Sequence, residues 1–341
     1  MPGTFMAREI AEVPEVVSRQ LTHGLASYLE EGRRLAAMNP RLVVTCARGT
    51  SDHAASYLKY LVETRIGIPV ASVGPSVASI YKAPLRLPDA ACVTISQSGG
   101  SPDLLALQET ARKGGARTVA LLNVTDSPVG GAADCVLPLL AGPEKAIAAT
   151  KSFVASLFAI SAIVAAWTGD KELEQALNAL PDALAAALNA DWSKAAMPLA
   201  KASSLFTLSR GPGLSIAFEA ALKFKETCRL HAEAFSAAEV RHGPIAISGN
   251  RFAALVFMPQ DESRSSVVES VAAMRATGAR IYTADCIVDG EFTLLCTAAP
   301  HLALRPLVQV VSFYIFVETL ARELGEDPDA PGYLRKVTET L

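Results

Sequence analysis

The stretch Val93–Asp103, VTISQSGGSPD, joins an apolar, β-branched run to a turn built almost entirely from serine, glutamine and glycine. The apolar run is typical of a buried strand, and the residues after Ser101 have the pattern of a helix. Because serine and glycine are ordinary turn residues, one interpretation is a plain turn. The other is an anion site, because such a turn at the start of a helix presents backbone N–H groups and the positive end of the helix dipole together.

Apolar runs of the same kind recur along the chain and alternate with helical patterns. They include RLVVTCA (41–47), ARTVALLN (116–123) and DCVLPL (134–139). Apolar strands separated by helices are typical of a parallel sheet with helices on both faces. We therefore expect an α/β fold in which the serine-rich turn lies at the carboxyl end of a strand, where open parallel sheets bind their ligands.

The second half of the chain repeats the pattern of the first. Three stretches have counterparts at an offset of 162 or 163 positions: Arg48-Gly49 with Arg210-Gly211, ACVTISQS (91–98) with ALVFMPQD (254–261), and GGARTVALL (114–122) with TGARIYTAD (277–285). One insertion reconciles all three matches. The sequence thus predicts two tandem domains of one fold, each a three-layer αβα arrangement, related by a pseudo-two-fold axis.

The limits of these domains follow from where the strand and helix patterns begin and end. We expect a helical segment at 1–38, a first domain at 39–170, a helical connector at 171–202, a second domain at 203–325 and a C-terminal tail at 326–341.

Composition excludes several classes of protein. Of the 341 residues, half are hydrophobic and 19% are charged, and the net charge of −3 comes with no basic stripe, which argues against a nucleic-acid partner. The apolar helix expected at 152–167 is about a turn shorter than the roughly 20 residues that span a bilayer, so a core helix is favoured over a membrane span. The N-terminus lacks the apolar segment of a signal peptide, and the six cysteines lack metal-ligand spacing. We expect a cytoplasmic protein.

The repeat separates the two interpretations of the serine-rich turn. Asp261 stands in the second copy where Ser98 stands in the first, and the glycines are missing there too. A carboxylate repels an anion, whereas a hydroxyl donates to it. Only the first copy therefore has anion-binding chemistry, which weakens the interpretation as a plain turn.

Two further loops combine hydroxyl groups with the start of a helix. RGTSDH (48–53) follows a strand and supplies Thr50 and Ser51. AIAATKSF (146–153) places Thr150 and Lys151 before a long helix, where the alternative is an ordinary helix start with a surface lysine.

Ionisable groups gather in FEAALKFKETCRLHAEAFSAAEVRHGPIAI (218–247). Glu219, Lys223 and Glu226 are spaced i, i+4, i+7 and share one face of a helix. This spacing often marks a solvated, salt-bridged face, but apolar residues are interleaved here, and a carboxylate held among them is a candidate general base. His242 precedes a Gly-Pro bend that exposes its ring; a structural histidine is the alternative.

The C-terminal stretch DAPGYLRKVTETL (329–341) is too polar for a core element. Its alternative is a disordered tail. Tyr333, Leu334 and Val337 nevertheless supply apolar anchors, and Lys336 stands between them, where it can be brought into a covered site.

These motifs together resemble the family of double SIS (sugar isomerase) domain proteins. RGTSDHA, SQSGGSPD, ATKSF, ALKFKE, HAEAFSAAEVRHGP and YLRKVT occur in the family's order over nearly the whole chain. The chain is most similar to the isomerase half of glutamine–fructose-6-phosphate aminotransferase. Its SQSGxSPD loop looks more like stand-alone members, including glucosamine-6-phosphate deaminases and phosphosugar isomerases.

The resemblance implies roles for individual residues. In the first domain it implies contacts to a substrate phosphate from Thr50, Ser51, Ser96, Gln97, Ser98 and Ser101. It implies a substrate pocket that includes Ala148, Ala149, Thr150, Lys151, Glu219 and Lys223. Catalysis would fall to Glu226 as the base, His242 for ring opening, contributed by the neighbouring subunit, and Lys336 over the sugar's carbonyl, with the tail closing the site.

The resemblance also implies the reaction. Residue 2 is proline and no amidotransferase domain precedes the motifs, so we expect no ammonia from glutamine. We expect a homodimeric enzyme without metal or organic cofactor that converts glucosamine 6-phosphate to fructose 6-phosphate and ammonia. The alternatives are another amino-sugar phosphate, such as galactosamine or fructosamine phosphate, and a non-catalytic sugar-phosphate-sensing module.

Overall fold

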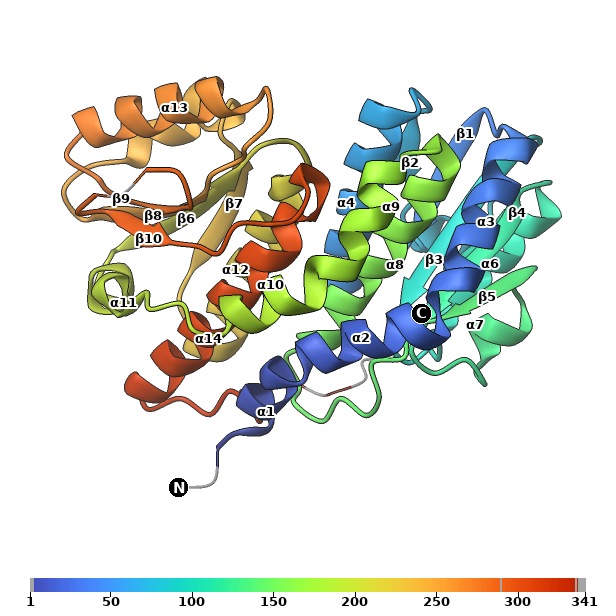
Figure 1. Ribbon diagram of the computed structural model, residues 1–341, viewed down its shortest axis with the longest axis horizontal. Coiled ribbons are helices and arrows are strands. Elements are labelled where there is room, and N and C mark those ends of the chain that lie inside the picture. Colours follow the sequence, from blue (N-terminus) through green and yellow to red (C-terminus); the bar gives the residue numbers. More distant parts are fainter. Residues whose placement is uncertain (1–2, 289, 335, 337–341) are drawn as a thin grey trace. The chain divides into compact units, whose positions relative to one another are not determined.

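The computed structural model describes residues 3–288, 290–334 and 336, and it divides into two compact units with one sheet each (Figure 1). The first-sheet unit contains Glu15–Glu144, Lys151–Asn178 and Lys336. The second-sheet unit contains the chain up to Pro14, Lys145–Thr150 and Ala179–Leu334. Because both units combine segments that are distant in sequence, the domain limits expected above stay a prediction.

The first sheet has five parallel strands in the order β2-β1-β3-β4-β5. They are β1 (Leu42–Cys46), β2 (Val70–Ser72), β3 (Ala90–Ser96), β4 (Arg117–Leu122) and β5 (Cys135–Pro138). The helices of this half of the chain are α1 (Phe5–Ala11), α2 (Val13–His23), α3 (Leu25–Met38), α4 (Thr50–Arg65), α5 (Ser76–Ser79), α6 (Pro102–Lys113), α7 (Pro128–Gly131), α8 (Lys151–Thr168) and α9 (Lys171–Ala176).

Helices cover this sheet because its strands are apolar on both sides. All seven residues of β3 are buried. One face packs against α5, α6 and α7 in a core that includes Val44, Cys92, Leu107 and Val129. Helix α4 contacts β1, β2 and β3, and α8 packs against α3 and α4. The predicted parallel sheet with helices on both faces is confirmed.

The second sheet has five parallel strands in the order β10-β9-β8-β6-β7. They are β6 (Ser204–Ser209), β7 (Ala232–Ser236), β8 (Phe252–Phe257), β9 (Arg280–Asp285) and β10 (Thr293–Leu295). The α-helices are α10 (Leu180–Ala187), α11 (Ser193–Ala200), α12 (Leu214–Cys228), α13 (Arg264–Ala276) and α14 (Arg305–Glu323). Short 3₁₀ helices are η1 (Leu177–Ala179), η2 (Gly211–Gly213), η3 (Glu239–His242), η4 (Pro244–Ile247) and η5 (Leu302–Leu304).

The two sheets have the same topology, as the sequence repeat predicts. Read from its other end, the second order is β7-β6-β8-β9-β10, which matches β2-β1-β3-β4-β5 strand for strand. The turns after β1 and β6 match as well, since Gly49 and Gly211 have φ angles of +52° and +63°. L-residues with side chains rarely adopt this left-handed conformation, which explains the glycine in both copies.

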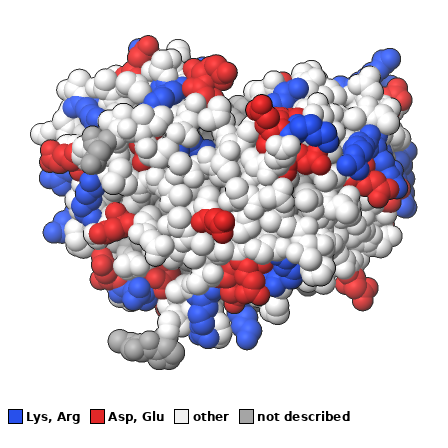
Figure 2. All heavy atoms as spheres, in the orientation of Figure 1, with Lys and Arg blue, Asp and Glu red and all other residues white. Residues whose placement is uncertain are grey.

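The two most apolar helices are core helices. Windows in α8 and in the α14 region (Leu302–Glu323) are long and apolar enough to span a membrane, but 89% and 83% of their residues are buried inside the protein. The helix predicted at 152–167 corresponds to α8, and its burial is that of the core helix expected from the sequence. On the face drawn in Figure 2, acidic and basic side chains are interspersed and neither sign forms a continuous stripe.

Close packing of α3 on α8 depends on Gly32. A Cβ atom at this position would overlap the backbone oxygen of Ile163 and lie 2.8 Å from the Cβ of Ala166. We expect Gly32→Ala to lower the free energy of unfolding by about 1–3 kcal/mol, since backbone atoms must move to admit the methyl group. Gly131→Ala is the matched control, because a Cβ there meets nothing within 4 Å. Urea unfolding followed by circular dichroism measures both; equal stability of the two variants would contradict this packing.

Candidate active site

A pocket of about 140 Å³ lies in the first-sheet unit, at the carboxyl ends of β1 and β3. We call it the serine pocket. It is lined by Arg48, Ser51, Ile95, Ser96, Gln97, Ser98, Ser101, Leu104 and Lys336. Five of the six residues that the resemblance assigned to a phosphate therefore lie together, and Lys336 of the tail joins them. The sixth, Thr50, is the first residue of α4 and lies next to Ser51 in the chain. It is not among the described residues that line the pocket.

Hydrogen bonds within the serine loop fix its shape. The Ser96 hydroxyl accepts from the backbone N–H of Gly99 at 3.1 Å, and the Ser98 hydroxyl accepts from that of Gly100 at 3.3 Å. Gly99 has a φ of +61°, and a Cβ there would overlap the Ser127 side chain. Glycine is therefore required at this turn.

The carbonyl groups of the same loop are turned toward a neighbouring loop. The oxygens of Ser96, Gln97 and Gly99 accept hydrogen bonds from the backbone N–H groups of residues 123, 124 and 129, at 3.0–3.3 Å. A carbonyl oxygen repels an anion, so directing these oxygens into the protein favours anion binding in the pocket.

Both cations of the pocket are backed by buried carboxylates. Arg48 donates through Nε and Nη2 to Oδ2 of Asp103, at 3.0 and 2.8 Å, and Asp103 has no exposed side-chain surface. The amine of Lys336 lies 3.7 Å from Oε2 of Glu144, which is also fully buried and accepts from the Ser152 hydroxyl at 2.6 Å. Two hydrogen bonds thus hold the positive charge of Arg48 at the pocket, and the charge of Lys336 lies near a buried carboxylate.

The second copy of the repeat fills the corresponding place with its own carboxylate. A Cβ built on Gly49 meets nothing within 4 Å, whereas one on Gly211 lies 3.7 Å from Oδ2 of Asp261. Asp261 Oδ1 accepts from the backbone N–H and the hydroxyl of Ser263, at 2.9 and 2.5 Å. The end of β8 therefore carries an internal anion, and the pocket of about 20 Å³ that Asp261 lines there is much smaller than the serine pocket.

A charged cluster lies on α12 in the second-sheet unit. Lys223 is fully buried, with its amine 3.1 Å from Oε1 of Glu219 and 2.7 Å from Oε2 of Glu226. Tyr314 donates to the same oxygen of Glu219 at 2.9 Å. Burial by itself favours the neutral amine, but the charges of the two carboxylates and their hydrogen bonds raise the pKa of Lys223 above its usual range, so it stays protonated.

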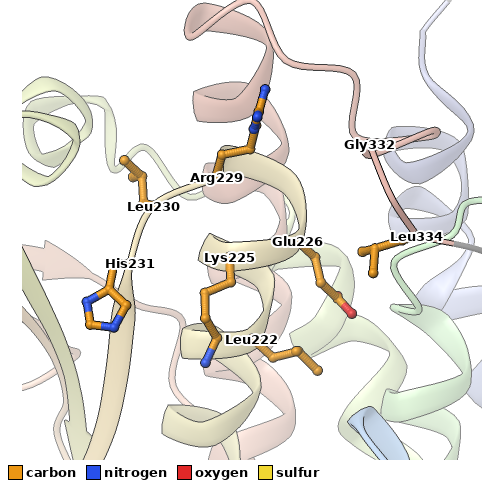
Figure 3. Close-up of a pocket in the computed structure, with 8 residues that line it drawn as sticks. All are labelled: Leu222, Lys225, Glu226, Arg229, Leu230, His231, Gly332 and Leu334. Carbon is orange, nitrogen blue, oxygen red and sulfur yellow. The ribbon is translucent and has the colours of Figure 1, made fainter.

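Glu226 is the member of this cluster that reaches solvent, with a fifth of its side chain exposed. It lines a groove of about 550 Å³ together with Leu222, Lys225, Arg229, Leu230, His231, Gly332 and Leu334. Figure 3 shows its carboxylate directed toward the side of α12 on which Leu334 lies, whereas the Lys225 amine points another way. One carboxylate oxygen is thus held by Lys223, and the group is open to a ligand, as a general base requires.

The remaining predicted site residues are placed as follows. His242 ends the 3₁₀ helix η3 and is exposed. Ala148, Ala149 and Thr150 lie in the segment 145–150 of the second-sheet unit, and Lys151 begins α8 and is buried. None of these five residues lines the serine pocket among the residues described.

The tail differs from the sequence interpretation. Tyr333 is fully exposed, so its predicted role as an apolar anchor is wrong. Among the described residues, no apolar side chain covers the Tyr333 ring, so the ring stays in contact with solvent. Leu334 lines the groove beside Glu226, and Val337 lies outside the described residues.

Arg48 in the pocket lining was missed in the sequence analysis, and so were Asp103 and Glu144, the buried carboxylates next to Arg48 and Lys336. Arg48 had a signal, since it directly precedes the GTS loop, and Asp103 follows the proline that begins α6. Glu144 gave none, because its contacts with Lys336 and Ser152 arise only in the folded chain.

Comparison with known proteins identifies the class to which this fold belongs. Residues 38–166 match the model of the SIS domain. The crystal structure of a proposed phosphosugar isomerase from Silicibacter pomeroyi is 43% identical, with a TM-score of 0.90 over 96% of this chain and all of that one. The chain belongs to the SIS domain family.

More distant relatives extend the comparison. The glutamine–fructose-6-phosphate aminotransferase of Bradyrhizobium diazoefficiens is 32% identical over 97% of this chain, and the chain spans 58% of the length of that relative. The glucosamine-6-phosphate deaminase of Thermotoga maritima is 17% identical, with a TM-score of 0.73 over 96% of this chain and all of that one, which shows a shared fold.

The buried ion pairs on α12 lead to a prediction about stability. We expect Lys223→Met to lower the free energy of unfolding by about 3–5 kcal/mol, because Glu219 is left as a buried charge without its cation. The double variant Lys223→Met/Glu219→Gln removes both charges and should recover most of this loss. Urea unfolding measures the two variants; a single variant as stable as the wild type would show that the buried ion pair does not contribute as described.

Proposed function

We propose that the protein is a phosphosugar isomerase that also releases ammonia, and that it converts glucosamine 6-phosphate and water to fructose 6-phosphate and ammonia. The observation that carries the proposal is the serine pocket. It combines hydroxyl groups, a loop whose carbonyl oxygens point away, and the cations Arg48 and Lys336, at the carboxyl ends of parallel strands. This combination suits a phosphoryl group better than a neutral ligand.

Anchoring one end of the sugar serves catalysis at the other end. Binding energy from a phosphate that does not react can be used to orient C1 and C2 of the substrate. Interconversion of an aldose-type and a ketose-type carbon requires a proton to leave one of these carbons and arrive at the other. In the proposal Glu226 carries this proton, and Lys223 keeps its carboxylate oriented.

Two further roles belong to the proposal. Lys336 orients the carbonyl end of the open-chain sugar from its position in the serine pocket. The exposed His242 assists ring opening in the site of a second copy of the chain, so the working form is a homodimer. Proton transfer of this kind needs an acid, a base and fixed geometry, and the proposal requires no metal or organic cofactor.

The named relatives support this class of chemistry. They include an isomerizing aminotransferase and a proposed phosphosugar isomerase, and a glucosamine-6-phosphate deaminase shares the fold. The cluster around Lys223 favours an enzyme over a sugar-phosphate sensor, because a sensor has no need of a carboxylate that is held by a buried lysine and open to a groove. The alternative within the same chemistry is another amino-sugar phosphate, such as galactosamine or fructosamine phosphate.

Phosphate binding is tested by copying the second repeat into the first. Ser98→Asp removes a hydroxyl of the serine pocket and adds a charge of the same sign as the ligand. We expect affinity for fructose 6-phosphate to fall by at least about 100-fold, since a charge-assisted hydrogen bond is lost and a repulsion is gained. Isothermal titration calorimetry measures it, with Ser18→Asp on the exposed surface of α2 as the control. Unchanged affinity in Ser98→Asp would refute phosphate binding in this pocket.

The general base is tested with an isosteric change. We expect Glu226→Gln to keep the affinity for glucosamine 6-phosphate while turnover falls by about 10²–10⁴-fold, because the amide keeps the shape but has no basic oxygen. Exchange of the C2 proton with deuterated solvent, followed by NMR, reports the step itself. Glu233→Gln on β7, also exposed, is the control and should exchange at the wild-type rate. Exchange that persists in Glu226→Gln and is lost in Glu233→Gln would move the base to Glu233.

A further inference from the structure

We propose that Arg48 is a ligand of the substrate's phosphoryl group and that it makes the serine pocket select a dianionic phosphate over a singly charged anion. This inference rests on the proposed function, because it concerns the same pocket, and it goes further by giving Arg48 a direct contact with the phosphoryl group and a role in selecting its charge. Hydroxyl and backbone N–H donors can bind both monoanions and dianions. A fixed guanidinium in the same pocket adds a positive charge that attracts a dianion more strongly than a monoanion.

The contacts of Arg48 leave it fixed and available. Its Nε and Nη2 atoms both donate to Oδ2 of Asp103. These bonds use two of the five N–H groups of a guanidinium, and the contacts within the described part of the chain leave the others for a ligand. The side chain is 52% exposed and lines the pocket beside the serine hydroxyls.

Asp103 acts as the positioning residue. It is fully buried in the first turn of α6, where the helix dipole favours a negative charge, and its Oδ1 accepts from the backbone N–H of Leu104 at 2.9 Å. A carboxylate held in this way can neither rotate nor move into the pocket. It therefore aims Arg48 while staying behind it.

The second repeat provides an internal comparison. At the offset of 163 positions, Asp103 corresponds to Ser266, and Arg210 at the matching turn donates to the Ser266 hydroxyl at 2.7 Å. In both copies the arginine thus contacts the helix that follows the next central strand, α6 after β3 and α13 after β8. This shared contact is a structural role. At this turn, a buried carboxylate behind the arginine and open space beside the glycine occur together in the first copy, where Ser98 stands in place of Asp261. A role in the fold alone does not account for that combination.

The test compares two sugars of the same shape and different charge. Glucose 6-phosphate has a second pKa near 6 and is largely a dianion at pH 7.5, whereas glucose 6-sulfate stays a monoanion. We expect the wild-type protein to prefer the phosphate, and Arg48→Gln to weaken phosphate binding by about 10–100-fold and sulfate binding much less, so that the preference collapses. Arg48→Lys keeps a charge and should keep much of the preference. Arg34→Gln is the matched control, because Arg34 is 58% exposed and paired with Glu30.

Calorimetry at pH 7.5 gives outcomes that separate this inference from the proposed function. Equal wild-type affinity for the two esters overturns the inference even if Arg48→Gln does not fold. An Arg48→Gln variant that loses both ligands equally, or neither, also overturns it and leaves Arg48 with the structural role of Arg210. If wild-type protein binds glucose 6-phosphate no more tightly than glucose, phosphate recognition in the proposed function fails, and the inference fails with it.

Discussion

Parallel pairing of β1 with β3 is the constraint on which the serine pocket depends. In a parallel sheet all strands end at the same edge, so the loops after β1 and β3 must meet there. The next strand, β4, sends residues 123–129 to the same edge, where their N–H groups bind the serine loop's carbonyl oxygens. The polar face of the loop is then left to the pocket, and α6 begins beside it with Asp103 in its first turn. Strand order thus brings the loops after β1 and β3 together in one pocket, which Lys336 of the tail also lines, and the loop after β4 holds the serine loop in place.

The two copies show how one topology carries different chemistry. Both have the same strand order and the same glycine turn after the first strand of the pattern. In the second copy Asp261 lies at that turn as a built-in anion, and Arg305 is buried with an ion pair to Asp285 at 3.4 Å. The second sheet instead carries the cluster of Lys223, Glu219 and Glu226 on α12, the helix after that turn. The phosphate-binding and proton-transfer roles that we propose are thus assigned to different copies of one topology.

Local pattern predicted the fold and much of the candidate site. The strands, the repeat, the serine loop and the shared face of Glu219, Lys223 and Glu226 are all set by residues close in sequence, where periodicity and turn chemistry apply. Contacts between distant residues had no such signal: Arg48 with Asp103, and Lys336 with Glu144, form only when strand order brings their loops together. The prediction for Tyr333 was wrong for another reason: an aromatic residue in a polar tail need not be buried, and this one is exposed. Whether His242 acts across a dimer stays a prediction.

We propose that this chain is an enzyme acting on phosphorylated amino sugars, and its activity on a panel of such sugars is the direct test. Purified protein would be incubated with glucosamine, galactosamine and fructosamine 6-phosphates and with glucosamine itself, and ammonia and ketose 6-phosphate measured together. We predict equal amounts of ammonia and fructose 6-phosphate from glucosamine 6-phosphate, and neither from unphosphorylated glucosamine. Release of no product from any phosphorylated amino sugar, or equal rates with and without the phosphate, would contradict it.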